Sequence, residues 1–489
     1  MSMVGLSIID KPTIVFDRTR EWNELEQFIT SSTSRLGVVY GRRRLGKTHL
    51  VEHFTKALNG LYFCAAQQSS EANLADLSRA VEEWINSPTP VRYSSWDEAL
   101  QHILHVGSDQ KRTVAVLDEV GYLIEGTPSF PSLLQRALDR RPRPNVPIIL
   151  SGSTQAVMKK LTASGQPLRG RANLEMTIGP FDFRTMAAFW GVTNARTAVL
   201  LWSVVGGTPG YKELCNDQAP RSELGFPGWL ARYLLSPSAA LHREGRIVVA
   251  EEAANSEPAS HWAVLSAITA GHTTREAIAR TIGRAPTALA NSLTMLVGSG
   301  LIARHEDPLH GRRSNYRVAE PVITAWKELV EPIERRVLRT DPATLFNDIE
   351  APLHAQVVAP AYEQLVVDWA MDFASEATLG GRPSTVGSSV LGRSYVDGAQ
   401  IDLVAVQREP SGQRRVLAIG EAKHRIRPVG LAELHRLEAI RSRLHGDHES
   451  NEIKLILACD AGFDRDLSRI ARSRSDIELV DADRLLTGD

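Results

Sequence analysis

The sequence predicts an α/β protein with a parallel sheet, followed by a helical segment, three helices with a hairpin, and a second α/β block. Three observations lead to this fold class. Short apolar runs alternate with helical patterns over about residues 1–180, which is typical of a parallel sheet with crossover helices. The strand pattern fades over about residues 183–252, and strands and helices alternate again from about residue 350. A chain of 489 residues has room for about three domains.

The composition is that of a globular protein. Hydrophobic residues make up 43% of the chain and charged residues 23%, which excludes a largely disordered protein. No apolar run approaches the roughly 20 residues of a membrane-spanning helix, and we expect no signal peptide. With only Cys64, Cys215 and Cys459, the chain has neither a disulfide framework nor a paired-cysteine metal site, which predicts a cytoplasmic protein. The net charge is −1, so any basic surface must be local.

The expected strands of the first sheet are short runs of apolar and β-branched residues. They cover residues 36–40, 61–65, 113–117, 147–150 and 174–178. In the helical segment, Gly206-Gly207-Thr208-Pro209-Gly210 predicts a tight turn between two helices, because glycine and proline interrupt helical patterns.

A glycine-rich motif follows the first expected strand. The pattern G-x-x-x-x-G-K-[ST] is matched by Gly41, Arg42, Arg43, Arg44, Leu45, Gly46, Lys47 and Thr48. Its glycines let backbone N–H groups surround phosphates at the start of the helix expected next. We expect Lys47 to reach the β- and γ-phosphates of ATP and Thr48 to bind Mg²⁺. The alternative is a chance match.

Two acidic residues and a serine follow other strands of the same sheet. Asp118 and Glu119 come directly after the run at 113–117. Asp118 would hold the Mg²⁺ shell, and Glu119 would orient and deprotonate the attacking water. Ser153 follows the run at 147–150 and could sense the γ-phosphate. The alternatives are two solvated acids and an ordinary turn.

Two arginines precede the last strand of this sheet. Arg169 and Arg171 are candidates for stabilising the charge of the transferred phosphoryl group, within the chain or across a subunit interface. They could equally be surface arginines of a loop.

The sequence resembles the archaeal and bacterial P-loop ATPases of the AAA+-related STAND class. In these proteins an ATPase is joined to a winged helix and a nuclease-like C-terminal domain of poorly defined function. The resemblance is carried by the phosphate-binding motif and by Phe16-Asp17-Arg18, Glu24-Leu25, Leu117-Asp118-Glu119, Gly152-Ser153, Gly179-Pro180-Phe181 and Gly206-Gly207-Thr208-Pro209. It implies that Arg18 lies near the adenine and that Pro209 contacts the nucleotide from the helical subdomain.

Residues 261–318 show the order of a winged helix-turn-helix. Helical patterns cover 261–270, 275–282 and 286–297, and strands are expected at 301–304 and 314–318. The third helix has no Lys or Arg beyond Arg284 at its start, so it is poorly equipped to read bases. The positive charge lies in the hairpin, on Arg304, His310, Arg312, Arg313 and Arg317. The hairpin could contact DNA phosphates; alternatively, the module packs within the chain or between subunits.

The last α/β block contains an acid followed by a Glu-x-Lys pattern. Asp402 lies in the strand expected at 400–406, and Glu421-Ala422-Lys423 closes the next strand, which is the PD-(D/E)XK nuclease arrangement. Alternation places Glu421 and Lys423 on one face, where Asp402 and Glu421 can share a divalent ion. Lys423 would orient water or stabilise the phosphorus centre. Glu363, on the preceding helix, is the further expected metal ligand. The alternatives are solvated strand ends and a degenerate nuclease fold that only binds.

The predicted domains are a P-loop ATPase core at 1–182, a helical lid at 183–255, a winged helix-turn-helix with its connector at 256–340, and a restriction-endonuclease-like α/β domain at 345–489. We expect ATP and Mg²⁺ as cofactors, with Mg²⁺ or Mn²⁺ at the C-terminal site. The expected function is an ATP-hydrolysing switch coupled to a nuclease-like module that acts on DNA. The alternative is a regulatory ATPase that binds DNA or a protein partner without cleavage. The sequence permits a homo-oligomer and does not require one.

Overall fold

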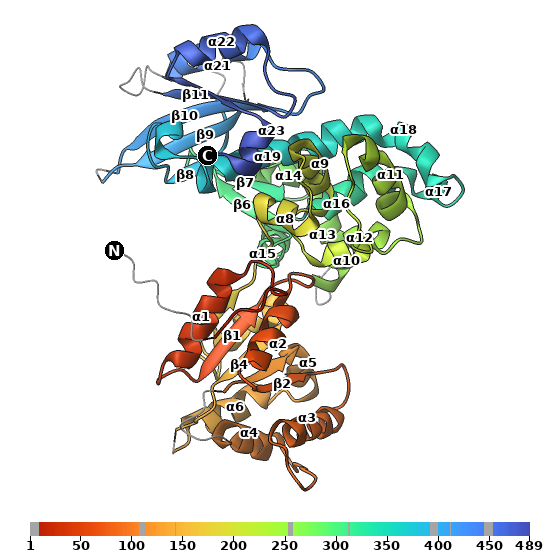
Figure 1. The fold of residues 1–489 in the computed structure, drawn as a ribbon, viewed down its shortest axis with the longest axis vertical. Helices are drawn as coiled ribbons and strands as arrows, with labels where there is room; N and C mark the ends of the chain where they lie inside the picture. Colours follow the sequence, from red (N-terminus) through yellow and green to blue (C-terminus); the bar gives the residue numbers. More distant parts are fainter. Residues whose placement is uncertain are drawn as a thin grey trace. The chain divides into compact units, whose positions relative to one another are not determined.

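The computed structural model describes residues 9–106, 113–141, 143–252, 258–311, 313–391, 400–410, 412–444 and 453–489. The chain forms two compact units, Met1–Pro180 and Phe181–Asp489 (Figure 1). The boundary at residue 180 lies close to the predicted end of the ATPase core, and the domain boundaries expected inside the second unit stay predictions. Among the described residues, no helix is long and apolar enough to cross a membrane.

The first unit contains a parallel five-stranded sheet with the order β2–β3–β4–β1–β5. Its strands are β1 (Leu36–Tyr40), β2 (Leu61–Cys64), β3 (Ala115–Asp118), β4 (Ile148–Gly152) and β5 (Ala172–Thr177). Its helices are α1 (Thr19–Thr30), α2 (Lys47–Ala57), α3 (Ser70–Trp84), α4 (Trp96–His105), α5 (Val120–Gly126), α6 (Phe130–Asp139) and α7 (Gln155–Thr162). All five predicted strands are confirmed, with ends that differ by no more than two residues.

Apolar cores lie on both faces of this sheet. Val38 belongs to one core and Val39 to the other, because successive residues of a strand point to opposite faces. Leu134 of α6 joins the first core, whereas Trp22 of α1 and Phe54 of α2 join the second. With both faces covered by helices, the carboxyl ends of the parallel strands remain as the place where polar side chains can gather.

The second unit begins with helices. They are α8 (Phe183–Trp190), α9 (Ala195–Val205), α10 (Gly210–Leu214), α11 (Phe226–Leu230) and α12 (Ala240–Glu252). The predicted tight turn lies between α9 and α10. Gly206 has a φ of 55°, and a side chain at Gly207 would collide with the backbone of Phe181. These two positions therefore require glycine.

Three helices and an antiparallel hairpin follow. They are α13 (Pro258–Thr269), α14 (Arg275–Ile282), α15 (Ala290–Gly298), β6 (Ile302–Glu306) and β7 (Ser314–Val318). The third helix, expected from Pro286, begins as a 3₁₀ turn over Pro286–Leu289 before α15. The helices that lead to the last sheet are α16 (Pro321–Ala325), η4 (Trp326–Val330), η5 (Glu331–Ile333), α17 (Glu334–Val337), α18 (Pro342–Pro352), η6 (Leu353–Val358), α19 (Ala359–Asp372) and α20 (Glu376–Leu379).

The unit ends with a mixed five-stranded sheet of order β12–β11–β10–β9–β8. Its elements are β8 (Thr385–Val390), β9 (Gln400–Arg408), β10 (Arg414–Lys423), α21 (Leu431–Leu444), β11 (Lys454–Cys459), α22 (Arg465–Ser473), β12 (Ile477–Val480) and α23 (Ala482–Thr487). β8, β9 and β10 are antiparallel neighbours, whereas β10, β11 and β12 are parallel. β8 begins at Thr385, and residues 392–399, which precede β9, lie outside the described part. β12 was not predicted, because its only sequence signal is a four-residue run.

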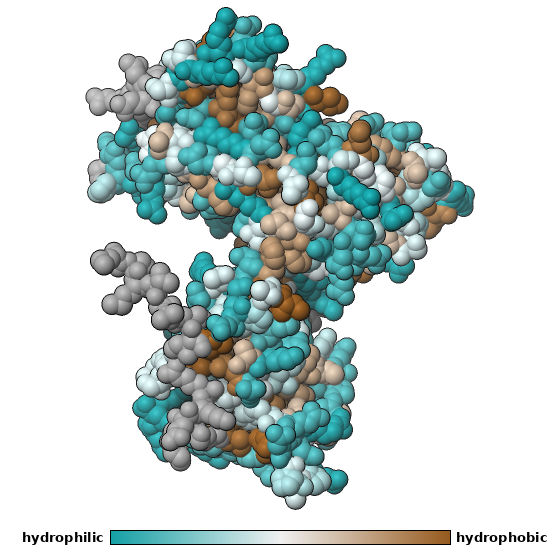
Figure 2. All heavy atoms as spheres, viewed as in Figure 1, coloured by the Kyte–Doolittle hydropathy of each residue, from teal (hydrophilic) through white to brown (hydrophobic). Residues whose placement is uncertain are grey.

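Polar residues cover most of the face that Figure 2 shows. The most exposed large hydrophobic side chains, Leu224, Leu338 and Ile426, come from separate segments of the second unit. Singly exposed apolar residues of this kind are ordinary for a folded protein.

Candidate functional site

The phosphate-binding loop connects β1 to α2 and needs its glycines. A side chain at Gly41 would collide with the backbone carbonyl of Ile178, and Gly46 has a φ of 83°. The N-cap of α2 is Gly46, which has no side chain to accept the first backbone N–H groups of the helix, so these groups can donate to phosphate oxygens. The loop therefore fits a nucleotide phosphate by its backbone alone.

The loop side chains divide into buried and exposed ones. Arg42, Leu45 and Lys47 are buried, whereas Arg43 and Arg44 are exposed. The Lys47 ammonium donates a hydrogen bond of 2.8 Å to the carbonyl oxygen of Arg42, so it is folded over the loop rather than extended into solvent. A cation held at this place is suited to a phosphate bound in the loop.

The structure brings Thr48 and Asp118 together, as expected for two residues that hold one metal ion. Thr48 Oγ1 donates to Asp118 Oδ2 at 2.8 Å, and the Tyr62 hydroxyl donates to the same oxygen at 3.0 Å. Asp118 is fully buried, and its other oxygen accepts the backbone N–H of Glu119 at 2.9 Å. Hydroxyl and carboxylate oxygens are the donors that Mg²⁺ prefers, so these residues fit that ion.

Tyr62 was missed by the sequence analysis. It lies on β2, whose residue Cys64 pairs with Asp118 of β3. Burial, followed by the Asp118 carboxylate, raises the pKa of Tyr62 far above its usual value, so the phenol stays a hydrogen-bond donor. The only available signal was a polar atom on an otherwise apolar strand.

Glu119 and Ser153 also lie together at this edge of the sheet. Ser153 Oγ donates to Glu119 Oε2 at 2.9 Å. Glu119 has a φ of 49°, a left-handed conformation that is unfavourable for a residue with a side chain. Strain of this kind is often found at functional positions.

Arg18 contacts the phosphate-binding loop from α1. Its guanidinium donates to the carbonyl oxygens of Leu45, at 3.1 Å, and Gly179, at 2.7 Å, and it forms an ion pair with Glu21 at 3.0 Å. These contacts support the loop backbone, and the expected position near adenine stays a prediction. Pro209 belongs to the second unit, so its contact with the nucleotide also stays a prediction.

Arg171 has a different partner from the one expected. It forms a two-pronged ion pair with Asp139, with distances of 2.9 and 2.6 Å. It also donates to the carbonyl oxygens of Pro167 and Arg169. Arg169 itself is exposed. These contacts favour the interpretation of Arg171 as a loop arginine that supports its own segment.

The C-terminal sheet brings Asp402, Glu421 and Lys423 together on neighbouring strands. The Lys423 ammonium lies 2.6 Å from Glu421 Oε1 and 3.4 Å from Asp402 Oδ2. Glu421 is buried and is also paired with Arg436, while its Oε2 atom has no hydrogen-bond partner among the described residues. An orphaned buried carboxylate oxygen fits a site that takes a cation.

Glu363, on α19, is electrostatically coupled to this group. Burial, followed by the Asp402 carboxylate, raises the pKa of Glu363 to about 7, and Lys423 opposes that shift. Burial and Asp402 also raise the pKa of Glu421. However, the described residues contain no group of three His, Cys, Asp or Glu side chains placed to hold one metal ion. The donor types fit a divalent ion, but the three-carboxylate set is not assembled around a common point.

The hairpin of the three-helix module is attached to this sheet. Asp307, at the end of β6, is buried and accepts a hydrogen bond of 2.7 Å from Ser389 of β8. It also accepts the backbone N–H groups of Leu309 and His310, both at 3.0 Å. Arg304 and Arg313 are exposed, and Arg312 lies outside the described residues. This packing favours an intramolecular role for the hairpin over a free wing.

The family comparison concerns the first part of the chain. Residues 15–213 match the model of a family described as an ATPase domain predominantly from Archaea. The match extends past the unit boundary at residue 180 and includes the turn before α10. Residues 15–213 are therefore similar to this ATPase domain, and the motif at Gly41–Thr48 and the acids Asp118 and Glu119 lie inside the matched region.

The chain is 24% identical over 322 residues to the uncharacterized protein MJECL04 of Methanocaldococcus jannaschii, a match that covers 65% of this chain and 69% of that protein. Among solved structures, the Walker-type ATPase Paby2304 of Pyrococcus abyssi is 20% identical, with a TM-score of 0.49 and coverage of 65% of this chain and 97% of that chain. The ORC2 protein of Aeropyrum pernix is 13% identical, with a TM-score of 0.43 and coverage of 68% and 95%.

Proposed function

We propose that the protein is an ATP-hydrolysing switch of the STAND class, whose nucleotide site lies at the carboxyl edge of the first sheet. The observation that carries this proposal is the hydrogen bond between Thr48 and Asp118, which places a hydroxyl and a carboxylate next to the phosphate-binding loop. The finer division of the second unit, into a lid at 183–255, a winged helix with connector at 256–340 and a nuclease-like domain at 345–489, is part of the same proposal.

Each residue of the site has a separate role in this proposal. The loop backbone and Lys47 bind the phosphates, and Thr48 and Asp118 hold Mg²⁺. When bound, Mg²⁺ neutralises charge on the phosphate oxygens. Glu119 orients the attacking water and accepts its proton, and Ser153 holds the Glu119 carboxylate through their 2.9 Å hydrogen bond. The switch follows if nucleotide contacts differ between two states of the chain.

The test compares Lys47→Ala with Lys56→Ala in the full chain. Lys56 lies on the same helix and is exposed, so it controls for the loss of a lysine. We expect Lys47→Ala to abolish ATP hydrolysis and weaken ATP binding, while Lys56→Ala behaves as wild type. Equal activity in the two variants would refute the proposed site.

A second candidate function is DNA cleavage by the C-terminal sheet domain with Mg²⁺ or Mn²⁺. Two observations favour it. The order of a helix, three antiparallel strands, α21 and a parallel strand resembles that of restriction-endonuclease-like folds. In addition, the buried Asp402 and Glu421 and the half-buried Lys423 form a charge cluster. In this candidate, Asp402 and Glu421 bind the cation, and Lys423 stabilises negative charge at the phosphate. The docked hairpin and the ammonium between the two carboxylates favour the alternative, a regulatory ATPase that binds DNA or a partner without cutting.

A cleavage assay separates the two candidates. Supercoiled and branched DNA are incubated with the full chain and Mg²⁺ or Mn²⁺, with and without ATP. Wild type, Lys47→Ala and Lys423→Ala are compared, with Lys327→Ala as a lysine control on η4. Cleavage that disappears only with Lys423→Ala supports the nuclease, and Lys47→Ala then reports whether ATP controls it. If neither the wild type nor any variant cleaves DNA, the regulatory ATPase remains as the candidate function.

A further inference from the structure

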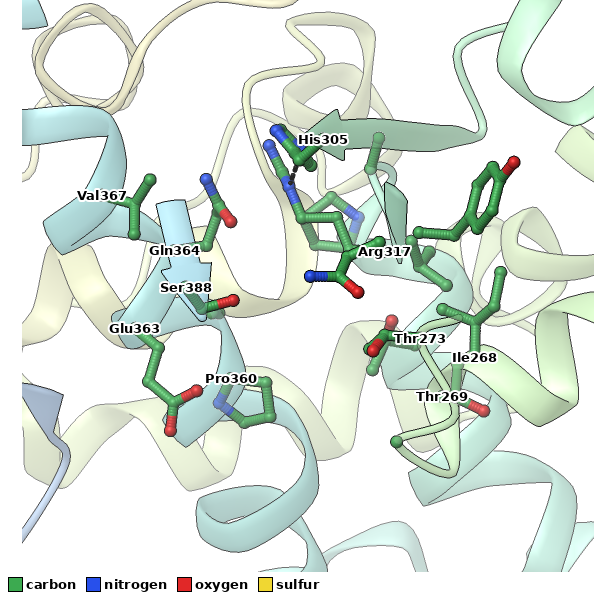
Figure 3. Close-up of a pocket in the computed structure, with 18 of the residues that line it drawn as sticks. Ile268, Thr269, Thr273, His305, Arg317, Pro360, Glu363, Gln364, Val367 and Ser388 are labelled. Carbon is green, nitrogen blue, oxygen red and sulfur yellow. Dashed lines mark hydrogen bonds between the residues drawn. The ribbon is translucent and has the colours of Figure 1, made fainter. Parts of the chain in front are cut away.

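A cavity of about 370 Å³ lies inside the second unit, with walls from the hairpin, α9, α13, α19 and the C-terminal sheet (Figure 3). This size is within the range of small-molecule sites in proteins. Glu363 and Asp402 line the same cavity, so it reaches the carboxylates of the C-terminal cluster. The cavity is not part of the ATPase site in the first unit, because all the residues that line it lie beyond residue 180.

Arg317 of β7 brings a positive charge to this cavity. Its Nε atom donates to His305 Nε2 on β6 at 2.7 Å, the contact drawn in Figure 3. Burial, followed by the Arg317 charge, lowers the pKa of His305 to about 4, so the imidazole is neutral at pH 7 and accepts this hydrogen bond. His305 therefore holds the guanidinium in place.

The remaining nitrogen atoms of Arg317 are available to a ligand. The described part of the chain offers its two Nη groups no hydrogen bond and no ion pair. Burial lowers the pKa of Arg317, and the Asp368 carboxylate opposes that shift. Asp368 also lines the cavity, but it forms no ion pair with Arg317 and accepts a 2.6 Å hydrogen bond from Gln364. A planar guanidinium in the wall of a cavity matches the oxygen atoms of a phosphate.

The other walls suit the rest of a nucleotide. Ile268 and Val367 supply apolar surface, whereas Thr269, Thr273 and Ser388 supply hydroxyl groups. Figure 3 places Ile268, Thr269 and Thr273 together on one side, and Val367, Ser388 and Glu363 on the other. Apolar walls with a few polar groups are what a base and a sugar require.

We propose that this cavity binds one nucleotide unit, with its phosphate on Arg317 and its base and sugar between α13 and α19. The unit is a free nucleoside monophosphate or the phosphorylated end of a strand, which share this chemistry. This inference deepens the candidate function of the C-terminal domain. The binding of a strand end rests on that candidate function, whereas the binding of a nucleotide does not require DNA cleavage.

The test uses the full chain with Lys47→Ala, which weakens phosphate binding at the loop. Deoxyadenosine 5′-monophosphate is titrated by calorimetry, and a single-stranded oligonucleotide with or without a 5′-phosphate is titrated in parallel. Arg317→Gln is added to this background, with Arg304→Gln as the matched control. Arg304 is an exposed arginine of the same hairpin, bonded to Ser314, and does not line the cavity. Ser388→Tyr fills the cavity without removing the charge.

We expect one binding site, affinity weakened about tenfold or more by Arg317→Gln and by Ser388→Tyr, and no change with Arg304→Gln. Preference for the 5′-phosphorylated oligonucleotide identifies a strand end, and binding of the mononucleotide alone identifies a free nucleotide. Thermal unfolding shows whether Arg317→Gln folds; if it does not, Ser388→Tyr decides. No binding of either probe, or binding unaffected by both changes, overturns the proposal. If the protein binds the nucleotide but cleaves no DNA, only the nuclease candidate is refuted.

Discussion

Thr48 Oγ1 donates a hydrogen bond of 2.8 Å to Asp118 Oδ2, although the two residues are 70 positions apart in the sequence. The contact exists because β1 and β3 are parallel strands of one sheet, so the loop after β1 and the acid that ends β3 meet at the same edge. The same Asp118 oxygen also accepts a hydrogen bond from the Tyr62 hydroxyl. The carboxylate is thus held in position before any metal ion arrives.

Thr48→Val tests the threonine as a metal ligand. Valine has nearly the same shape but cannot donate an oxygen, so we expect the Mg²⁺ concentration for half-maximal ATP hydrolysis to rise about tenfold or more. A magnesium titration of the ATPase rate measures this shift. Tyr62→Phe is the control, because it removes the other hydrogen bond to Asp118 Oδ2 and leaves the hydroxyl of Thr48. Unchanged magnesium dependence in Thr48→Val would exclude a ligand role.

Glu119→Gln tests the general base. The amide keeps the size of the side chain but cannot accept a proton, so we expect hydrolysis to slow by roughly 10²- to 10⁴-fold while ATP binding is retained. Phosphate release and nucleotide binding are measured in parallel. Glu125→Gln, an exposed change on α5, the helix that Glu119 precedes, serves as the control. A Glu119→Gln chain that hydrolyses ATP at the wild-type rate would rule out this role.

Gly41→Ala tests the packing of the phosphate-binding loop against β5. The added methyl group would meet the carbonyl of Ile178, so the loop or the strand end must shift. We expect the free energy of unfolding to fall by about 1–3 kcal/mol, together with weaker ATP binding. Gly179→Ala is the control, because its methyl group would meet nothing within 4 Å. Urea unfolding compares the two, and equal stabilities would contradict the packing argument.

His305→Gln tests the neutral imidazole beside Arg317. The folded protein lowers the pKa of His305 from 6.5 to about 4, so between these values the unfolded chain takes up a proton that the folded chain does not. Stability should therefore fall on acidification from pH 6.5 to pH 4, by on the order of 2 kcal/mol. Glutamine does not titrate, and its amide oxygen can accept the Arg317 hydrogen bond.

Urea unfolding at pH 7 and pH 4.5, followed by tryptophan fluorescence, measures the stability difference between wild type and His305→Gln. We expect the difference to move in favour of His305→Gln at pH 4.5. A difference that is independent of pH would show that His305 titrates normally in the folded chain.

Much of the first unit could be predicted from local pattern alone. The apolar runs identify β1 to β5, because a buried parallel strand needs continuous apolar residues. The motif at Gly41–Thr48 and the acids at 118 and 119 follow from the position of strand ends. In the second unit, the helical segment, the three helices with their hairpin and the alternation of helices and strands in the last block were also readable, whereas the short β12 was not.

Only the tertiary structure decided which polar side chains meet. Residues far apart in the sequence supply the partners of Asp118, Glu119 and Arg171, namely Tyr62, Ser153 and Asp139. The same holds for the cavity beside Arg317, whose walls come from several separate parts of the second unit. The sequence by itself determined the strands and the phosphate-binding loop, because apolar periodicity and glycine spacing act locally. Side-chain pairing and enclosed space depend on chain segments that packing alone brings into contact.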